Sequence, residues 1–252
     1  MASAFSRLLL ATEHGEFDSG AEAVALALAR RCDLPLAAVL PVLSNPEFEA
    51  VAPQLAERAD AEAARRRQSL QALALQAGVQ LQVQVRRGAE PFAEIVGEAR
   101  RHEADLLIIR RRGKRGLLAK LLVGEMVSKV VAHSSCSVLV APRGAQLWAR
   151  GVLACRDPQA PDAGLVEVAT AVAGECALPL YLHALAAGAD AQAAAEQVLA
   201  AARLQGADLI VLARNGGSRL GRAWASAVTQ KVVGLSECPV LVHVNPSPLT
   251  AS

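Results

Sequence analysis

Short apolar runs alternate with longer stretches of helical periodicity along this chain. Such runs are typical of strands buried in a parallel sheet, and the periodic stretches are typical of helices that pack on it. In residues 1–144 the pattern predicts strands at 8–12, 36–42, 79–86, 105–110 and 137–141. It predicts helices at 18–31, 50–77, 91–103 and 118–133. The alternation predicts an α/β protein whose sheet is covered by helices on both faces.

The same alternation continues in the rest of the chain. Strands are predicted at 152–156, 179–185, 208–213 and 239–244. Helices are predicted at 162–176, 189–205 and 220–234. The last residues, from Asn245 to Ser252, have the composition of a loose end.

An internal repeat explains this second series. ADLLII at 104–109 recurs as ADLIVL at 207–212, and CDLPLAAVL at 32–40 recurs as CALPLYLHA at 176–184. We therefore expect two homologous domains, 1–144 and 150–245. The offset between copies drops from 144 to 103 residues, so 41 residues of the first copy are missing from the second. The missing part corresponds to one helix and one strand, which leaves five strands in the first domain and four in the second.

Composition narrows the class of protein. Hydrophobic residues make up 53% and charged residues 20%, which excludes a disordered chain. The net charge of +2 gives no excess for binding nucleic acid or a membrane surface. No apolar run approaches the roughly 18 residues of a membrane helix, and the N-terminus does not have the pattern of a signal peptide. Five cysteines without a CxxC pair argue against a disulfide framework and a zinc site, so we expect a cytoplasmic protein.

The chain resembles the universal stress protein family in its tandem form. The segments that carry the resemblance are LLLATE, ADLLII, RRRGKRG and VVAHSSCSVLVAP in the first copy, and VLACRD, ADLIVL, ARNGG and KVVGLSECPVLVHV in the second. The resemblance implies doubly wound, Rossmann-like sheets of the adenine-nucleotide alpha-hydrolase type, with strand order 3-2-1-4-5. It also implies pairing through the last strands, so that 137–141 lies antiparallel to 239–244 within one chain. A homodimer through the shortened edge of the second domain is a further expectation.

Family members that bind ATP are expected to have G-x2-G-x9-G-[ST] after the fourth strand and an Asp after the first. The first copy has Glu13 at the Asp position, Arg110 at the first Gly, Gly113 at the second, and Gly124 followed by Glu125 at the end. A carboxylate at a helix N-terminus would itself occupy the free amides and would repel a phosphate. The first copy therefore departs from the motif at most positions.

The second copy departs less. Asp157 keeps the acid, Ala213 replaces the first Gly, Gly216 matches the second, and Ser226–Ala227 replaces the final pair. The nucleotide-binding candidates are therefore Asp157, Gly216 and Ser226, together with Gly113 and Gly124 of the first copy. No cofactor is expected in the first domain, and ATP remains open for the second.

A basic cluster lies beside the first crevice, formed by Arg110, Arg111, Arg112, Lys114 and Arg115. It would act as an anion clamp through Arg110, Arg112 and Lys114, or it would be a solvated loop. We also expect one of these three side chains to pair with Glu125 and so occupy the place of a phosphate.

No metal-ligand spacing and no catalytic triad can be found in the sequence. The resemblance and the degenerate motifs together favour a stress-response protein that acts as a non-enzymatic regulatory or interaction module. The alternative is an ATP-binding switch or slow ATPase that uses the second domain. An enzyme on a related adenine-binding fold is a third, more distant hypothesis.

Overall fold

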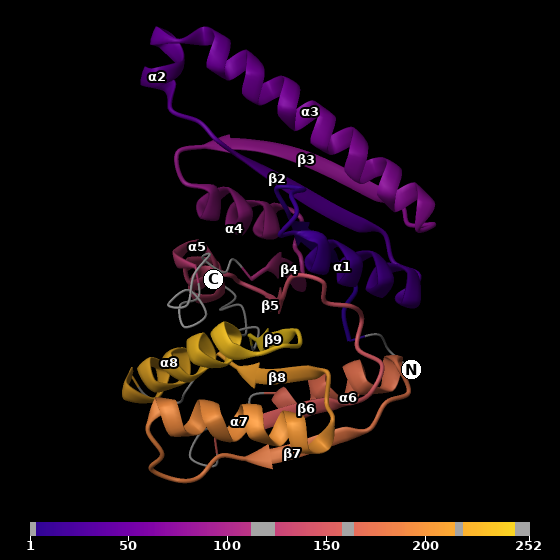
Figure 1. The fold of residues 1–252 in the computed structure, drawn as a ribbon, viewed down its shortest axis with the longest axis vertical. Coiled ribbons are helices and arrows are strands. Elements are labelled where there is room, and N and C mark those ends of the chain that lie inside the picture. Colours follow the sequence, from indigo (N-terminus) through magenta and orange to yellow (C-terminus); the bar gives the residue numbers. More distant parts are fainter. Residues whose placement is uncertain (1–3, 112–123, 158–163, 215–218, 245–252) are drawn as a thin grey trace, which may run out of the picture.

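The computed structural model describes residues 4–111, 124–157, 164–214 and 219–244. Within these residues nine strands form one mixed sheet, in the order β3-β2-β1-β4-β5-β9-β8-β6-β7 (Figure 1). The strands are β1 Leu8–Ala11, β2 Leu36–Leu43, β3 Leu81–Gly88, β4 Leu106–Arg110, β5 Ser137–Ala141, β6 Val152–Arg156, β7 Leu180–Ala184, β8 Leu209–Ala213 and β9 Val240–His243. The helices are α1 Ser19–Cys32, α2 Pro46–Val51, α3 Pro53–Gln76, α4 Pro91–Arg101, α5 Glu125–His133, α6 Leu165–Glu175, α7 Ala191–Gln205 and α8 Arg219–Leu235.

The two halves of the sheet meet at β5 and β9. All other neighbouring strands are parallel, whereas β5 and β9 are antiparallel, with Val138 opposite Val242 and Val140 opposite Val240. The predicted pairing of the two last strands is confirmed. It satisfies backbone groups that would otherwise form two exposed edges.

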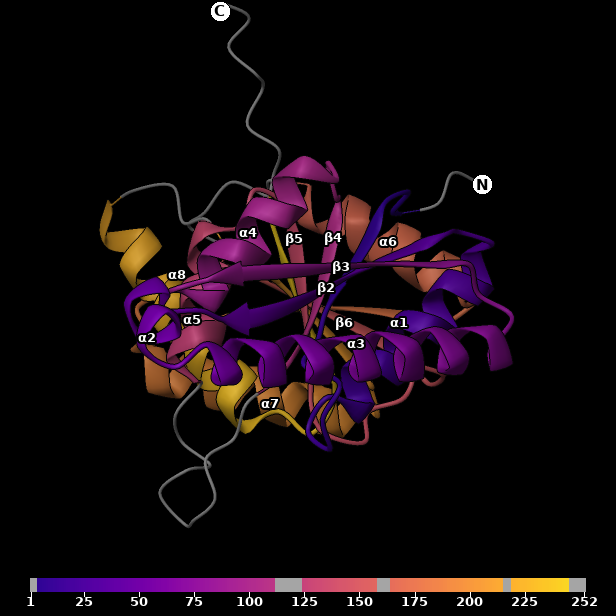
Figure 2. The same ribbon diagram turned by 90° about the horizontal axis from the view of Figure 1, so that it is seen from above.

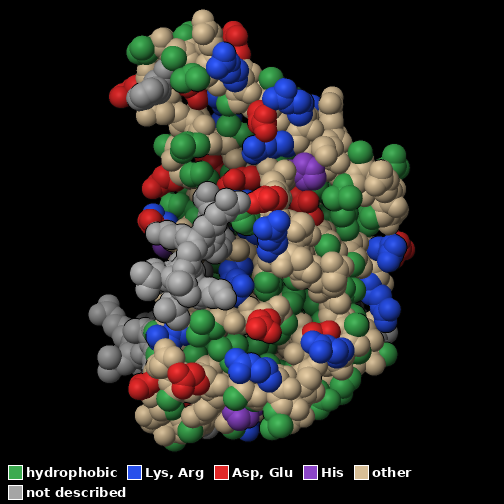
Figure 3. All heavy atoms as spheres, in the orientation of Figure 1, with side chains coloured by type: hydrophobic (Ala, Val, Ile, Leu, Met, Phe, Trp, Pro, Cys, Tyr) green, Lys and Arg blue, Asp and Glu red, His purple; other side chains and the backbone are tan. Residues whose placement is uncertain are grey.

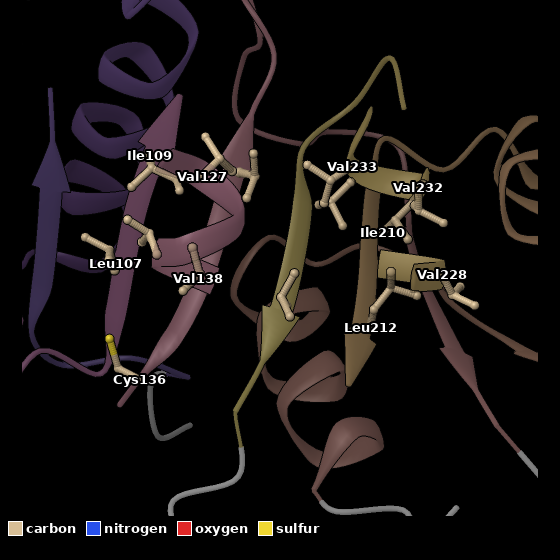
Figure 4. Close-up of a cluster of buried hydrophobic side chains, with 14 of the residues drawn as sticks. Leu107, Ile109, Val127, Cys136, Val138, Ile210, Leu212, Val228, Val232 and Val233 are labelled. Carbon is tan, nitrogen blue, oxygen red and sulfur yellow. The ribbon is translucent and has the colours of Figure 1, made fainter. Parts of the chain in front are cut away.

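Helices cover both faces of the sheet, as predicted. Successive strand residues point to opposite faces, so Leu8 and Leu10 lie in one core and Leu9 and Ala11 in the other. One core receives α1, α3 and α6, and the other receives α4, α5, α7 and α8. Figure 2 shows α3 and α4 on opposite sides of β2 and β3. Both cores continue across the seam between the halves, and Figure 4 shows apolar side chains from both sides of it.

One helix predicted from the sequence is replaced by two helices in the structure. The expected helix at 50–77 is divided into α2 and α3 at Ala52. Pro53 lacks an N–H and disfavours a helical conformation for the residue before it. The break therefore falls at the position that Pro53 imposes, and Pro53 starts α3.

The described second half has four strands, as predicted, and lacks counterparts of β3 and α3. The sheet consequently ends in β3 at one edge and in β7 at the other (Figure 1). No helix in the described ranges is long and apolar enough to span a bilayer. Basic and acidic side chains are interspersed over the face drawn in Figure 3.

Candidate functional site

The first candidate site is the crevice where strand order reverses beside β1. β1 lies between β2 and β4, and Ala11 at its end is opposite Ile109. In doubly wound sheets, ligands bind outside the carboxyl ends of the strands at such a point. Glu13 follows β1 and Arg110 ends β4, so both lie at this crevice.

The Arg110 side chain is buried in the crevice. Arg110 is 5% exposed, and its Nη1 donates to Oδ2 of Asp18 at 2.7 Å. Its Nη2 lies 2.8 Å from Oε1 of Glu13. The guanidinium therefore links the end of β4 to the loop after β1 and to the start of α1. Arg110 is thus not part of a solvated loop.

Asp18 is the buried partner in this ion pair. Asp18 is fully buried, and its carboxylate also accepts a hydrogen bond from the backbone N–H of Gly15 at 2.9 Å. Burial raises the pKa of the Asp18 carboxyl above its ordinary 3.8, and this exceeds the opposing effects of Arg110 and the Gly15 N–H. The nearby carboxylates of Glu22 and Glu13 raise it further.

A second set of hydrogen-bonded polar side chains, around Glu22, lies near this ion pair. The Thr12 hydroxyl donates to Oε1 of Glu22 at 2.7 Å, and the backbone N–H of His14 donates to the Thr12 hydroxyl. The imidazole of His14 lies 2.9 Å from Glu22 through Nδ1 and 2.8 Å from the Ser69 hydroxyl through Nε2. The crevice is therefore lined by side chains that already bond to one another, and a phosphate would meet the carboxylates of Glu13 and Asp18.

The remaining candidates of the first crevice divide into two groups. Gly113, Arg112 and Lys114 lie outside the described residues. Gly124 precedes α5, and Glu125 begins it. The Glu125 side chain is 83% exposed and pairs with Lys129 at 2.9 Å. The expected pair between Glu125 and Arg110 is therefore wrong, because Arg110 is turned inward to Asp18 and Glu13.

In the second half the structure describes two of the three candidates. Asp157 follows β6 directly and is half-buried. Ser226 is exposed and lines a small cavity of about 40 Å³ between α5 and α8. It lies inside α8, which begins at Arg219, so its backbone N–H is not one of the free donors of a helix N-terminus. Gly216 lies outside the described residues.

Two arginines that follow equivalent strands bind across the seam, a relationship that sequence reasoning missed. Arg111, after β4, donates through Nη1 to the carbonyls of Val233, Gly234 and Ser236 at the end of α8. In the reciprocal contact, Arg214, after β8, donates through Nη1 to the carbonyls of Val131 and Ser134 at the end of α5. The last carbonyls of a helix lack internal partners and attract cations. The only signal in the sequence was the recurrence of Arg at equivalent places.

Two aspartates of the repeated ADL motif have a structural role that sequence reasoning also missed. Asp105 accepts from the backbone N–H groups of Ser6 and Arg7. Asp208 accepts from those of Ala149, Arg150 and Gly151. Burial opposes ionisation of Asp208, yet the three N–H groups outweigh it and hold its pKa below 3.8.

No group of three or more His, Cys, Asp or Glu side chains in the described part of the chain could hold a metal ion. The strand order defines a tandem, doubly wound α/β protein with a switch point beside β1. The model of the universal stress protein family matches residues 4–142 and 188–243, more than half of the chain. The chain belongs to the universal stress protein family.

Solved structures share this fold over almost the whole chain. A protein described as a universal stress protein from Pseudomonas aeruginosa UCBPP-PA14 has a TM-score of 0.70 and 15% identity, covering 96% of this chain and 94% of its own. A universal stress protein from Archaeoglobus fulgidus DSM 4304 has a TM-score of 0.69 and 16% identity, covering 96% and 97%. A protein of unknown function from Pseudomonas aeruginosa PAO1 has a TM-score of 0.67 and 15% identity, covering 96% and 93%. No curated protein sequence matches the chain significantly.

Proposed function

We propose that this protein is a cytoplasmic stress-response protein that acts as a non-enzymatic regulatory or interaction module. Its first crevice would be closed to nucleotides by its own side chains. The buried ion pair between Arg110 and Asp18 supports this most directly, since Arg110 stands where nucleotide-binding members are expected to have glycine.

The energetics favour a closed first crevice. A phosphate that displaced the guanidinium of Arg110 would leave the fully buried carboxylate of Asp18 without its cation. Leaving one member of a buried pair uncompensated costs about 3–5 kcal/mol. A phosphate that instead shared the guanidinium would approach the carboxylates of Asp18 and Glu13. Both routes oppose nucleotide binding.

The alternative function is a nucleotide-binding switch or slow ATPase in the second half. Asp157 at the end of β6 and the exposed hydroxyl of Ser226 support it. A phosphate at Ser226 would have to use that hydroxyl, because the helix begins earlier, at Arg219. This weakens the anion site that a helix N-terminus would otherwise provide.

Isothermal titration calorimetry of the full chain with ATP and magnesium distinguishes the two functions. The proposed module should give no binding heat in the micromolar range, and Asp157→Asn and Ser226→Ala should leave this unchanged. Micromolar binding to the wild type that both variants abolish would establish the alternative. Micromolar binding to the wild type that survives both variants would place a nucleotide site outside the candidates of the second half, and would also overturn the proposal.

A further inference from the structure

The outer edge of β7 has backbone groups available for another strand. The residues on either side of β7 bond to β6: the carbonyl of Pro179 accepts from the N–H of Val152, and the N–H of Leu185 donates to the carbonyl of Arg156, both at 3.0 Å. Backbone groups in a strand alternate between its two edges, so the outward groups belong to Leu180, Leu182 and Ala184. Among the described residues, no strand lies on that side.

The same strand exposes an apolar side chain that the first half would cover. Leu182 is the third residue of β7, and its counterpart in β2 is Ala38. Ala38 is fully buried in a core to which α3 contributes Leu70 and Ala74. Leu182 is 59% exposed, because no helix in the described part of the second half takes the place of α3.

An apolar groove lies on the other side of β7. It has a volume of about 510 Å³ between β6, β7 and α7, and its lining includes Tyr181, His183 and Leu204. Leu204 is 84% exposed, and no Lys, Arg, Asp or Glu lines the groove. Nε2 of His183 is buried without a hydrogen-bond partner in the described part of the chain. Apolar surface therefore flanks the edge strand on both of its faces.

The opposite edge strand, β3, is charged, and this difference indicates which strand would pair with β7. β3 has Arg86 and Arg87, which pair with acids on the elements beside it, Glu98, Glu49 and Asp60. Charged side chains on an edge strand oppose pairing with another chain. β7 has the sequence LYLHA and no such charge. Pairing of β3 with β7 of another copy would leave a free β3 and a free β7 at the two ends, so copies would keep adding to an open filament. Pairing of β7 with β7 of a second copy gives a closed dimer with two-fold symmetry.

We propose that β7 pairs antiparallel with β7 of a second copy of this chain. The two-fold axis would lie at Leu182, which would face Leu182 of the second copy through the outward backbone groups. Leu180 would then lie opposite Ala184, and Tyr181 opposite His183. The join has the same chemistry as the apolar antiparallel contact that already links β5 to β9 within the chain. It goes beyond the proposed function, since it does not depend on whether either crevice binds nucleotide.

Sedimentation of the full chain over a concentration series tests this pairing. The wild type should approach twice the chain mass of 26.2 kDa as concentration rises. Leu182→Lys should remain a monomer at every concentration, because two like charges would meet across the axis. The matched control is Leu75→Lys, which changes an exposed leucine on α3, far along the chain from β7, and should still dimerise. Circular dichroism would verify that both variants are folded.

Hydrogen exchange gives a second readout on the wild type. The amides of Leu180, Leu182 and Ala184 should gain protection as concentration rises, while the amides of β3 should not. A wild type that stays monomeric at high concentration would overturn the proposal. So would a dimer that persists in Leu182→Lys, or one whose added protection lies away from β7.

Discussion

The guanidinium of Arg110 lies 2.7 Å from the carboxylate of Asp18, and both residues are almost completely buried. The two positions are 92 residues apart in sequence. Their contact joins the end of β4 to the start of α1 across the switch point of the first half. The same contact occupies the crevice in which a doubly wound fold ordinarily holds a ligand.

Removing the cation from this pair should strongly destabilise the fold. In Arg110→Met the buried carboxylate of Asp18 loses its guanidinium partner, so the free energy of unfolding should fall by about 3–5 kcal/mol. Urea unfolding followed by circular dichroism measures it. The matched control is Arg7→Met, which breaks an exposed pair with Glu103 and should cost at most about 1 kcal/mol. Adding Asp18→Leu to Arg110→Met should recover part of the loss, and an Arg110→Met variant as stable as the control would contradict the role of the pair.

Two aspartates should make the stability depend on pH in opposite directions. The pKa of Asp18 is raised in the folded state, so its contribution is full below about 3.8 and is lost as pH rises through the folded pKa. The pKa of Asp208 is lowered, so its contribution is present above about 3.8 and is lost as pH falls through the folded pKa.

Urea midpoints measured across acidic pH, relative to the matching Asn variants, separate these two effects. The advantage of the wild type over Asp18→Asn should shrink as pH rises. Its advantage over Asp208→Asn should shrink as pH falls. If the advantage of the wild type changed with pH in the same direction for Asp18→Asn and for Asp208→Asn, at least one of the two pKa shifts would have the opposite sign.

The reciprocal arginines should stabilise the seam between the halves. Arg111→Met and Arg214→Met each remove hydrogen bonds from a charged donor to helix carbonyls, so each should lower the free energy of unfolding by about 1.5–3 kcal/mol. Lysine at either position keeps the charge but lacks the planar fork and should recover only part of the loss. Arg143→Met, which removes an exposed side chain 3.6 Å from Glu16 and over the ring of Phe17, should change stability by no more than about 1 kcal/mol. Equal effects of all three methionine variants would refute the capping role.

The thiol of Cys155 should resist modification in the folded protein. Burial raises its pKa to about 12, so only about one molecule in ten thousand would carry the reactive thiolate at about pH 8. Mass spectrometry after reaction with a thiol reagent should find Cys155 unlabelled in buffer and labelled in urea. The half-buried cysteines, Cys32, Cys176 and Cys238, should react before it. Rapid labelling of Cys155 under native conditions would show that its part of the core opens readily.

The sequence by itself determined the order of helices and strands and the division into two copies, whereas the pairing of the last strands came from the family resemblance. Local apolar runs located the strands, and the drop in repeat offset predicted the missing helix and strand of the second half. These features depend on residues close in sequence or on comparison between copies, so no knowledge of packing was needed. The single helix expected at 50–77 was wrong, because Pro53 ends the first helical segment at Val51 and starts a new one.

Only the tertiary structure decided which side chains meet. The five basic residues that begin at the end of β4 look alike in sequence, yet Arg110 turns inward to Asp18 while Arg111 crosses the seam to α8. In the same way, Leu182 follows the pattern of a buried strand residue and is exposed because none of the helices in the residues that the structure describes covers it. Partners separated by many residues are brought together by the order of the strands. Whether a side chain is buried depends on what packs above it, and neither property is present in the local pattern.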